Sequence, residues 1–238
     1  MFLEKFYSLE DGKTLVSPKQ ASSFAKNIAD DFNPIHNPES KRFCVPGDLL
    51  FSLVLNKYGL SQNMCFKFSG MVGKNISLNL PEPKDNQITI TDDNGKEYLK
   101  INRKGDVSHD NALIERFIRS YVAFSGQTFP HILVPLMAEN GVMINPERPL
   151  VIYESMSVEL NSIKITEPHL ELSGTTLEVN GKRGEVSVTF DVKCGEEIVG
   201  KGIKKLVLSG LREFDQEQIN KIVDNYSSSK NQYLANNR

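Results

Sequence analysis

A chain of 238 residues with 39% hydrophobic and 24% charged residues is long enough for one large domain or two small ones around a substantial core. Its net charge is −2 and no block of Lys and Arg stands out, which argues against nucleic acid as a partner because phosphate binding needs clustered cations. There is no apolar signal-peptide segment, no apolar run long enough to cross a membrane, and no cysteine spacing that suggests disulfides or zinc among Cys44, Cys65 and Cys194. We therefore expect a reduced, cytoplasmic location.

The first predicted helix begins after Ser17, which can cap it, while Pro18 suits the first helical position and Gln20 completes a capping box. Apolar residues then follow at helical spacing up to Ile28. The helix ends near Asp30-Asp31, and Asn33-Pro34 turns the chain because the residue before a proline is pushed out of the α region. Asp31, Asn33 and His36 thereby place a carboxylate, a carboxamide and an imidazole around one turn.

A strongly apolar helix is predicted from Asp48 to Tyr58, opened by Val45-Pro46-Gly47 and closed by Gly59 as its C-cap. Because it is apolar on nearly all sides, we expect a sheet to wrap around it. Four strand-like segments follow, over residues 64–72, 75–80, 87–91 and 97–103. The polar segment 104–110 is the predicted domain junction.

The second half begins with an amphipathic helix near Asp110 that ends around Ser125-Gly126, and Val134-Pro135 then starts another apolar helix. Strands are predicted over residues 150–160, 170–179, 185–193 and 198–208, with hairpin turns at Asn180-Gly181 and Gly195. A last helix runs from Asp215 to about Tyr226. The Ser- and Asn-rich end beyond it is predicted to be disordered.

The two halves share one order of elements, which indicates an internal repeat. Each has an amphipathic helix, a turn around proline, a Val-Pro start to an apolar helix, and several antiparallel strands. In this register Asp31 aligns with Gln127, Asn33 with Phe129, Pro34 with Pro130, and His36 with Ile132. The polar trio is therefore present only in the first half. We predict domains over residues 1–107 and 108–214, followed by a helix and polar tail over 215–238.

A long apolar helix inside a curved antiparallel sheet is the hot-dog arrangement, and two such units, each a sheet wrapping its helix, would form a pseudo-dimer of the α+β class. Residues 29–36, Ala-Asp-Asp-Phe-Asn-Pro-Ile-His, resemble the signature Ser-Gly-Asp-x-Asn-Pro-Ile-His of the MaoC-like or R-specific enoyl-CoA hydratase family. The second half keeps, at Ser125-Gly126, the Ser-Gly that the first half has lost. The whole chain also resembles members of a bacterial family of unknown function.

The resemblance implies hydration of a trans-2-enoyl thioester, or dehydration of the R-3-hydroxyacyl form, in fatty acid metabolism. Asp31 and His36 would share one water as acid and base, a role that typically contributes about 10²–10⁴-fold. Gly47 would let backbone N–H groups approach the thioester oxygen, and Asn33 would position the turn and the substrate. No cofactor or metal is implied. The implied partners are an acyl thioester of coenzyme A or a carrier protein, and a second copy in a homodimer of double hot-dogs.

Two other functions stay open from the sequence. A non-catalytic module that binds an acyl thioester or a protein fits the missing Ser-Gly before Asp31 and the short loop from His36 to Gly47. A thioesterase is the other, since one fold can host both chemistries. Taken alone, a His is more often structural than catalytic. However, a carboxylate at the C-terminus of a helix opposes the helix dipole, which favours a functional reason for Asp31.

Overall fold

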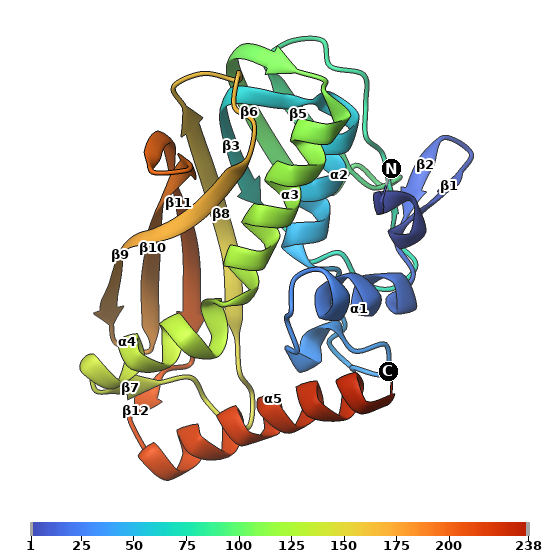
Figure 1. Cartoon of the computed structure of the whole chain (residues 1–238). Helices are drawn as coiled ribbons and strands as arrows, with labels where there is room; N and C mark the ends of the chain where they lie inside the picture. The colour runs from blue at the N-terminus through green and yellow to red at the C-terminus, as the bar shows by residue number, and fades with distance from the viewer. Residues whose placement is uncertain (1, 237–238) are drawn as a thin grey trace.

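The computed structural model describes residues 2–236, and its main feature is a curved antiparallel sheet packed against two long helices (Figure 1). The helical elements are η1 (Phe2–Phe6), α1 (Pro18–Asn27), η2 (Pro34–His36), α2 (Gly47–Tyr58), α3 (Asn111–Gly126), η3 (Thr128–Ile132), α4 (Leu133–Glu139) and α5 (Gln216–Asn236). The strands are β1 (Ser8–Glu10), β2 (Lys13–Leu15), β3 (Leu60–Phe68), β4 (Ser77–Leu78), β5 (Gln87–Thr91), β6 (Glu97–Ser108), β7 (Val142–Met143), β8 (Val151–Leu160), β9 (Pro168–Asn180), β10 (Arg183–Cys194), β11 (Glu197–Ser209) and β12 (Arg212–Glu213).

The large sheet has seven strands in the order β5-β6-β3-β8-β11-β10-β9. Strands of the first half meet strands of the second half where β3 pairs antiparallel with β8, with Phe66 opposite Met156. The predicted α+β class and the hot-dog arrangement are confirmed. The two predicted sheets are joined edge to edge into one, because the β3–β8 pairing gives each half's edge strand a hydrogen-bonding partner.

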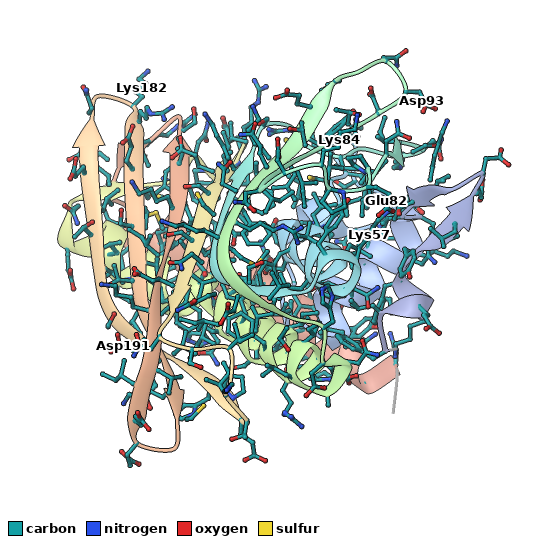
Figure 2. The ribbon with its side chains drawn as sticks, turned by 90° about the horizontal axis from the view of Figure 1, so that it is seen from above. Lys57, Glu82, Lys84, Asp93, Lys182 and Asp191 are labelled. Atoms are coloured by element: carbon teal, nitrogen blue, oxygen red, sulfur yellow. The ribbon has the colours of Figure 1, made fainter. Side chains whose placement is uncertain are left out.

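Helix α2 lies in the concave side of this sheet, and the view from above shows the strands curving around it (Figure 2). Four of its apolar side chains are fully buried: Leu49, Phe51, Val54 and Leu55. Burying one such side chain is worth roughly 1.5–3 kcal/mol, so α2 is the centre of the hydrophobic core. Helix α3 packs against α2 and β9, and the short α4 also contacts β9.

The helix ends follow the local signals in the sequence. Ser17 caps α1 and forms the predicted capping box with Gln20. Asp110 caps α3 by accepting hydrogen bonds from the N–H groups of Ala112 and Leu113. Gly59 ends α2 with φ of 84°, a backbone conformation that favours glycine. These boundaries were predicted correctly because each rests on neighbouring residues alone.

Two polar segments are more ordered than their composition predicts. Residues 104–108, which lie in the predicted junction segment, form the end of β6, which stays paired with β3 up to Leu60 opposite Ser108. Backbone pairing with β3 outweighs the polar composition there, and Gly105, with φ of 84°, lies next to an irregularity in the register. Residues 227–236 are not disordered, because α5 continues to Asn236.

Helix α5 runs across one end of the molecule and reaches α1 (Figure 1). Tyr233 donates a hydrogen bond to Asn27, and Lys230 forms an ion pair with Asp30. These contacts explain why a Ser- and Asn-rich sequence is helical here. Among residues 2–236, no helix is long and apolar enough to cross a membrane. The domain division at residues 107 and 214 stays a prediction.

Candidate active site

The turn after α1 is built from side chains that hydrogen-bond to nearby backbone. Asp30 leaves the helix with φ of 53°, a left-handed conformation that Asp tolerates better than most residues. Asp31 Oδ1 accepts a hydrogen bond from the N–H of Asn33 at 2.8 Å, and Asn33 Oδ1 accepts one from the N–H of Ile35 at 3.1 Å. Two such Asx turns in succession bring His36 back toward Asp31. Asn33 therefore shapes the turn through its side chain.

Asp31 and His36 form a pair across this turn. The distance from His36 Nε2 to Asp31 Oδ2 is 3.5 Å, and His36 Nδ1 lies 2.7 Å from the carbonyl oxygen of Cys44. A carbonyl oxygen only accepts, so Nδ1 carries the proton in that bond and Nε2 is directed at Asp31. The histidine side chain is 12% exposed and the aspartate side chain 26%, so the pair is largely shielded yet accessible.

The pair is electrostatically coupled. Burial alone would raise the pKa of Asp31, but the hydrogen bond and charge of His36, together with the Asn33 N–H, hold it below its ordinary value. Burial alone would lower the pKa of His36, but the hydrogen bond and charge of Asp31 raise it above the ordinary value. The arrangement therefore favours a carboxylate facing a histidine that readily holds a proton, which is an acid–base pair able to polarise one water.

A cavity of about 730 Å³ contains all four residues that the sequence singled out. Asp31, Asn33, His36 and Gly47 all line it. Its volume lies within the range of roughly 300–1,000 Å³ that is typical of small-molecule sites. The rest of the wall is largely apolar and includes Leu50, Phe68, Val72, Leu133, Ile144 and Leu206. An apolar chain with one reactive polar end would match this lining.

Gly47 has two roles in the geometry of this wall. A Cβ placed on it would lie 2.7 Å from the ring of Tyr153, so a glycine is needed for Tyr153 to pack there. Gly47 and Asp48 are also the first two residues of α2, and the first N–H groups of a helix have no partner inside it. Those N–H groups, at the positive end of the helix dipole, suit a developing oxyanion.

A second polar cluster lies in the same cavity, and sequence reasoning missed it. Lys204 Nζ donates to Ser125 Oγ at 2.5 Å and to Thr128 Oγ1 at 3.3 Å, and Ser125 Oγ donates to Asp48 Oδ2 at 2.7 Å. We call Asp48, Ser125, Thr128 and Lys204 the inner network. Burial raises the pKa of Asp48 and lowers that of Lys204, while the attraction between their charges opposes both shifts.

Only part of the inner network left a signal in the sequence. On β11, Lys204 alternates with the buried Leu206 and Leu208, so its side chain belongs to the inward face of a strand where an apolar residue is expected. Asp48 could not be distinguished from an ordinary acidic residue in the first turn of a helix. Ser125 attracted notice only as part of the second half's Ser-Gly.

The two proline turns touch each other beside this network. A Cβ on Gly126 would lie 1.5 Å from the carbonyl oxygen of Ala29, so only glycine allows this approach. The N–H of Phe32 donates to the hydroxyl of Tyr226, and the rings of Phe32 and Phe129 both pack against the Tyr226 ring, with centroids 6.1 and 5.3 Å away. The site is thus assembled from both halves and covered by α5.

Within residues 2–236, no group of three or more His, Cys, Asp or Glu side chains is arranged to hold a metal ion. Burial raises the pKa of the Cys44 thiol to about 11, so this cysteine beside the site is a neutral thiol at ordinary pH. The polar groups that line the cavity include the Asp31–His36 pair and the inner network.

Three solved structures illustrate what the chain is similar to. A MaoC-like dehydratase aligns at 10% identity and a TM-score of 0.41, covering 86% of this chain and 99% of the other. A conserved hot-dog protein of unknown function from Alicyclobacillus acidocaldarius aligns at 10% identity and 0.45, covering 87% and 97%. The acyl-CoA thioesterase II TesB2 from Mycobacterium marinum aligns at 9% identity and 0.40, covering 71% and 90%. At these scores the likenesses do not identify a reaction.

At the level of sequence, residues 1–217 match a family described as "Protein of unknown function (DUF3581)". No curated protein matches the chain. The match stops where α5 begins, so the helix that covers the proline turns lies almost entirely outside it.

Proposed function

The chain belongs to the DUF3581 family, and we propose that its cavity hydrates trans-2-enoyl thioesters or catalyses the reverse dehydration of R-3-hydroxyacyl thioesters. The observation that carries the proposal is the Asp31–His36 pair, in which His36 Nδ1 is held by the Cys44 carbonyl and Nε2 points at the carboxylate. Both side chains line a cavity whose remaining wall is largely apolar. The family resemblance of residues 29–36 points to the same reaction.

In the hydration direction, one water binds between Asp31 and His36. The water oxygen forms a bond to the β-carbon while the pair takes one of its protons, and the electrons of the double bond move toward the thioester carbonyl. The α-carbon then receives a proton from the pair, so that one water has been added and the pair returns to its starting state. Each proton transfer by a positioned group of this kind contributes about 10²–10⁴-fold.

The intermediate charge needs hydrogen-bond donors. Gly47 and Asp48, at the start of α2, line the cavity, and their N–H groups are the donors that we propose for the thioester oxygen. At the outer part of the cavity, Arg42 and Arg148 are exposed lining residues. We propose that they meet the phosphates of coenzyme A or of a carrier protein's phosphopantetheine, while the acyl group enters the apolar interior.

The test is to mix purified protein with crotonyl-CoA and follow both the loss of enoyl absorbance and the release of free thiol. Loss of absorbance without thiol release is expected. Thiol release alone would instead identify a thioesterase. Stabilisation against heat by saturated acyl-CoA, with no conversion of any enoyl chain length, would identify a non-catalytic binding module.

The cellular setting stays part of the proposal. Cys44, Cys65 and Cys194 are free in the structure, which fits the cytoplasmic location that we propose. A homodimer of double hot-dogs, and a role in fatty acid metabolism, are proposed on the resemblance alone. Analytical ultracentrifugation of the purified chain tests the proposed homodimer directly.

A further inference from the structure

The inner network is an unusual feature for the wall of an apolar cavity. It joins Asp48 of α2, Ser125 of α3, Thr128 of η3 and Lys204 of β11, and Ser125 and Lys204 are only 3% and 5% exposed. Replacing a buried ion pair by apolar side chains of similar volume is often neutral or stabilising. The network therefore calls for a reason other than stability.

One atom of the network lacks a partner. Asp48 Oδ2 accepts from Ser125, whereas Asp48 Oδ1 is buried with no hydrogen-bond partner among the described residues. Within the described part of the chain, the only other such side-chain atom is Ser61 Oγ on β3. Leaving a buried acceptor unpaired destabilises the fold, and the cost is greater for a charged group. A donor supplied by a ligand would remove this cost.

The other members of the network are already satisfied. Lys204 donates to Ser125 and Thr128, and its ammonium also lies 4.6 Å from the centre of the Tyr153 ring. Thr128 donates in turn to the carbonyl oxygen of Ser125. The network therefore lacks one hydrogen-bond donor, which would pair with Asp48 Oδ1.

We propose that the inner network is a subsite for a hydroxyl group carried by the acyl chain of the substrate, with that hydroxyl donating to Asp48. This inference rests on the proposed function for the thioester end of the ligand. In the dehydration direction, the hydroxyl on the β-carbon belongs to Asp31 and His36. The hydroxyl at the inner network is therefore a second one, and the substrate class is a hydroxylated acyl thioester.

Charge and depth select a hydroxyl over other donors. A cationic donor would be repelled by Lys204, and a carboxylate would meet the Asp48 acceptor with like charge. The amide N–H groups of a pantetheine arm belong to the outer part of the cavity, where Arg42 and Arg148 are exposed, whereas Ser125 and Lys204 are buried. Asp48 itself is one of the residues that line this cavity.

The experiment measures binding rather than turnover. Calorimetry compares the binding of S-hexyl-CoA, a thioether that can be neither hydrated nor hydrolysed, with that of its S-hydroxyhexyl derivatives. These derivatives are isomers of one another, each with one hydroxyl on a different carbon beyond the β-carbon. One isomer is expected to bind about tenfold more tightly than S-hexyl-CoA, as a charge-assisted hydrogen bond would give. That gain is expected to disappear in Asp48→Asn and to shrink in Ser125→Ala.

Ser52→Ala is the matched control. Ser52 is also a buried hydroxyl on α2, but it donates to the backbone carbonyl of Asp48 and is not part of the network, so the gain should persist. Thermal melting of each variant shows whether it is folded.

If no isomer binds more tightly than S-hexyl-CoA, the inference is overturned, whether or not crotonyl-CoA is hydrated. If one isomer gains affinity while no enoyl thioester is hydrated, the proposed function fails and the subsite stands. A gain that survives unchanged in Asp48→Asn also overturns the assignment to the inner network.

Discussion

The two proline turns, residues 29–36 and 125–132, come at the end of the first α-helix of each half but carry different side chains. The first turn presents Asp31 and His36 to the cavity. At the matching positions of the second turn, Gln127 is exposed and Ile132 packs against the hydrophobic core. The acid–base groups are therefore intact on one side only, while the other side contributes packing.

The second turn nevertheless contributes residues to the site. Its Ser125 belongs to the inner network, and Gly126 allows the close approach to Ala29 that sets the two turns side by side. The Ser-Gly missing from the first turn is present in the second, so the cavity holds parts of the signature from both. In the predicted repeat, the groups of the signature would therefore be divided between the two turns.

The largest expected effect comes from removing the acid of the first turn. Asp31→Asn should lower the rate of enoyl hydration by about 10²–10⁴-fold, because the variant can no longer exchange a proton with water. Asp30→Asn is the control: Asp30 is exposed, has φ of 53°, which Asn also tolerates, and lies next to Asp31 in sequence. Equal rates for the two variants would show that the first turn is not catalytic.

The next largest effect concerns Lys204, the residue that the second half contributes to the inner network from β11. Lys204→Met should destabilise the fold by about 3–5 kcal/mol at neutral pH, because it leaves the Asp48 charge buried without its partner. Asp48 has a folded pKa raised above its unfolded value, so the loss should shrink as the pH is lowered and Asp48 becomes protonated. Urea unfolding at several pH values measures this.

Lys205→Met is the matched control for Lys204→Met. Lys205 is the next residue on β11 and is exposed on the opposite face of the strand. Its substitution should change stability by less than about 0.5 kcal/mol. A pH-independent loss in Lys204→Met would argue against the attraction between the charges of Asp48 and Lys204.

A smaller effect is expected where the turns touch. Gly126→Ala would place a Cβ 1.5 Å from the carbonyl oxygen of Ala29, so the turns must separate, at a cost of about 1–3 kcal/mol or more. Gly73→Ala is the control, since nothing lies within 4 Å of a Cβ there. If both variants unfold at the same urea concentration, the turns are not in contact in solution.

The smallest effect concerns the helix that covers the turns. The hydroxyl of Tyr226 accepts from the N–H of Phe32 at 3.1 Å and donates to the carbonyl of Asp30 at 3.2 Å. Tyr226→Phe keeps the ring packing and removes both bonds, which should cost about 1 kcal/mol. Tyr233→Phe, which removes an exposed bond to Asn27, should cost less. The same midpoint for both variants would contradict this role of Tyr226.

Much of the first turn could be predicted from the sequence because its structure is local. The capping box of α1, the Asx turns around Asn33 and the return of His36 all depend on residues within a few positions of one another. The apolar character of α2 likewise predicted its burial. In these places short-range signals and the final fold agree.

The inner network could not be predicted in the same way, because its members come together only in the folded chain. Ser125 and Lys204 are far apart in sequence, and the side chain of Asp48 gives no sign that it will face them. The extension of α5 was missed for a related reason. Its polar composition predicts disorder, while its contacts with Asn27 and Asp30 stabilise the helix.

The pairing of Asp31 with His36 is tested most directly by an NMR titration of the His36 ring nitrogens in the wild-type chain and in Asp31→Asn. The folded pKa of His36 is raised, so its contribution to stability is fully present below the unfolded value of about 6.5 and is lost as the pH rises through the folded value. Asp31→Asn is therefore predicted to lower the pKa of His36. An unchanged His36 titration in the variant would contradict the existence of a coupled acid–base pair.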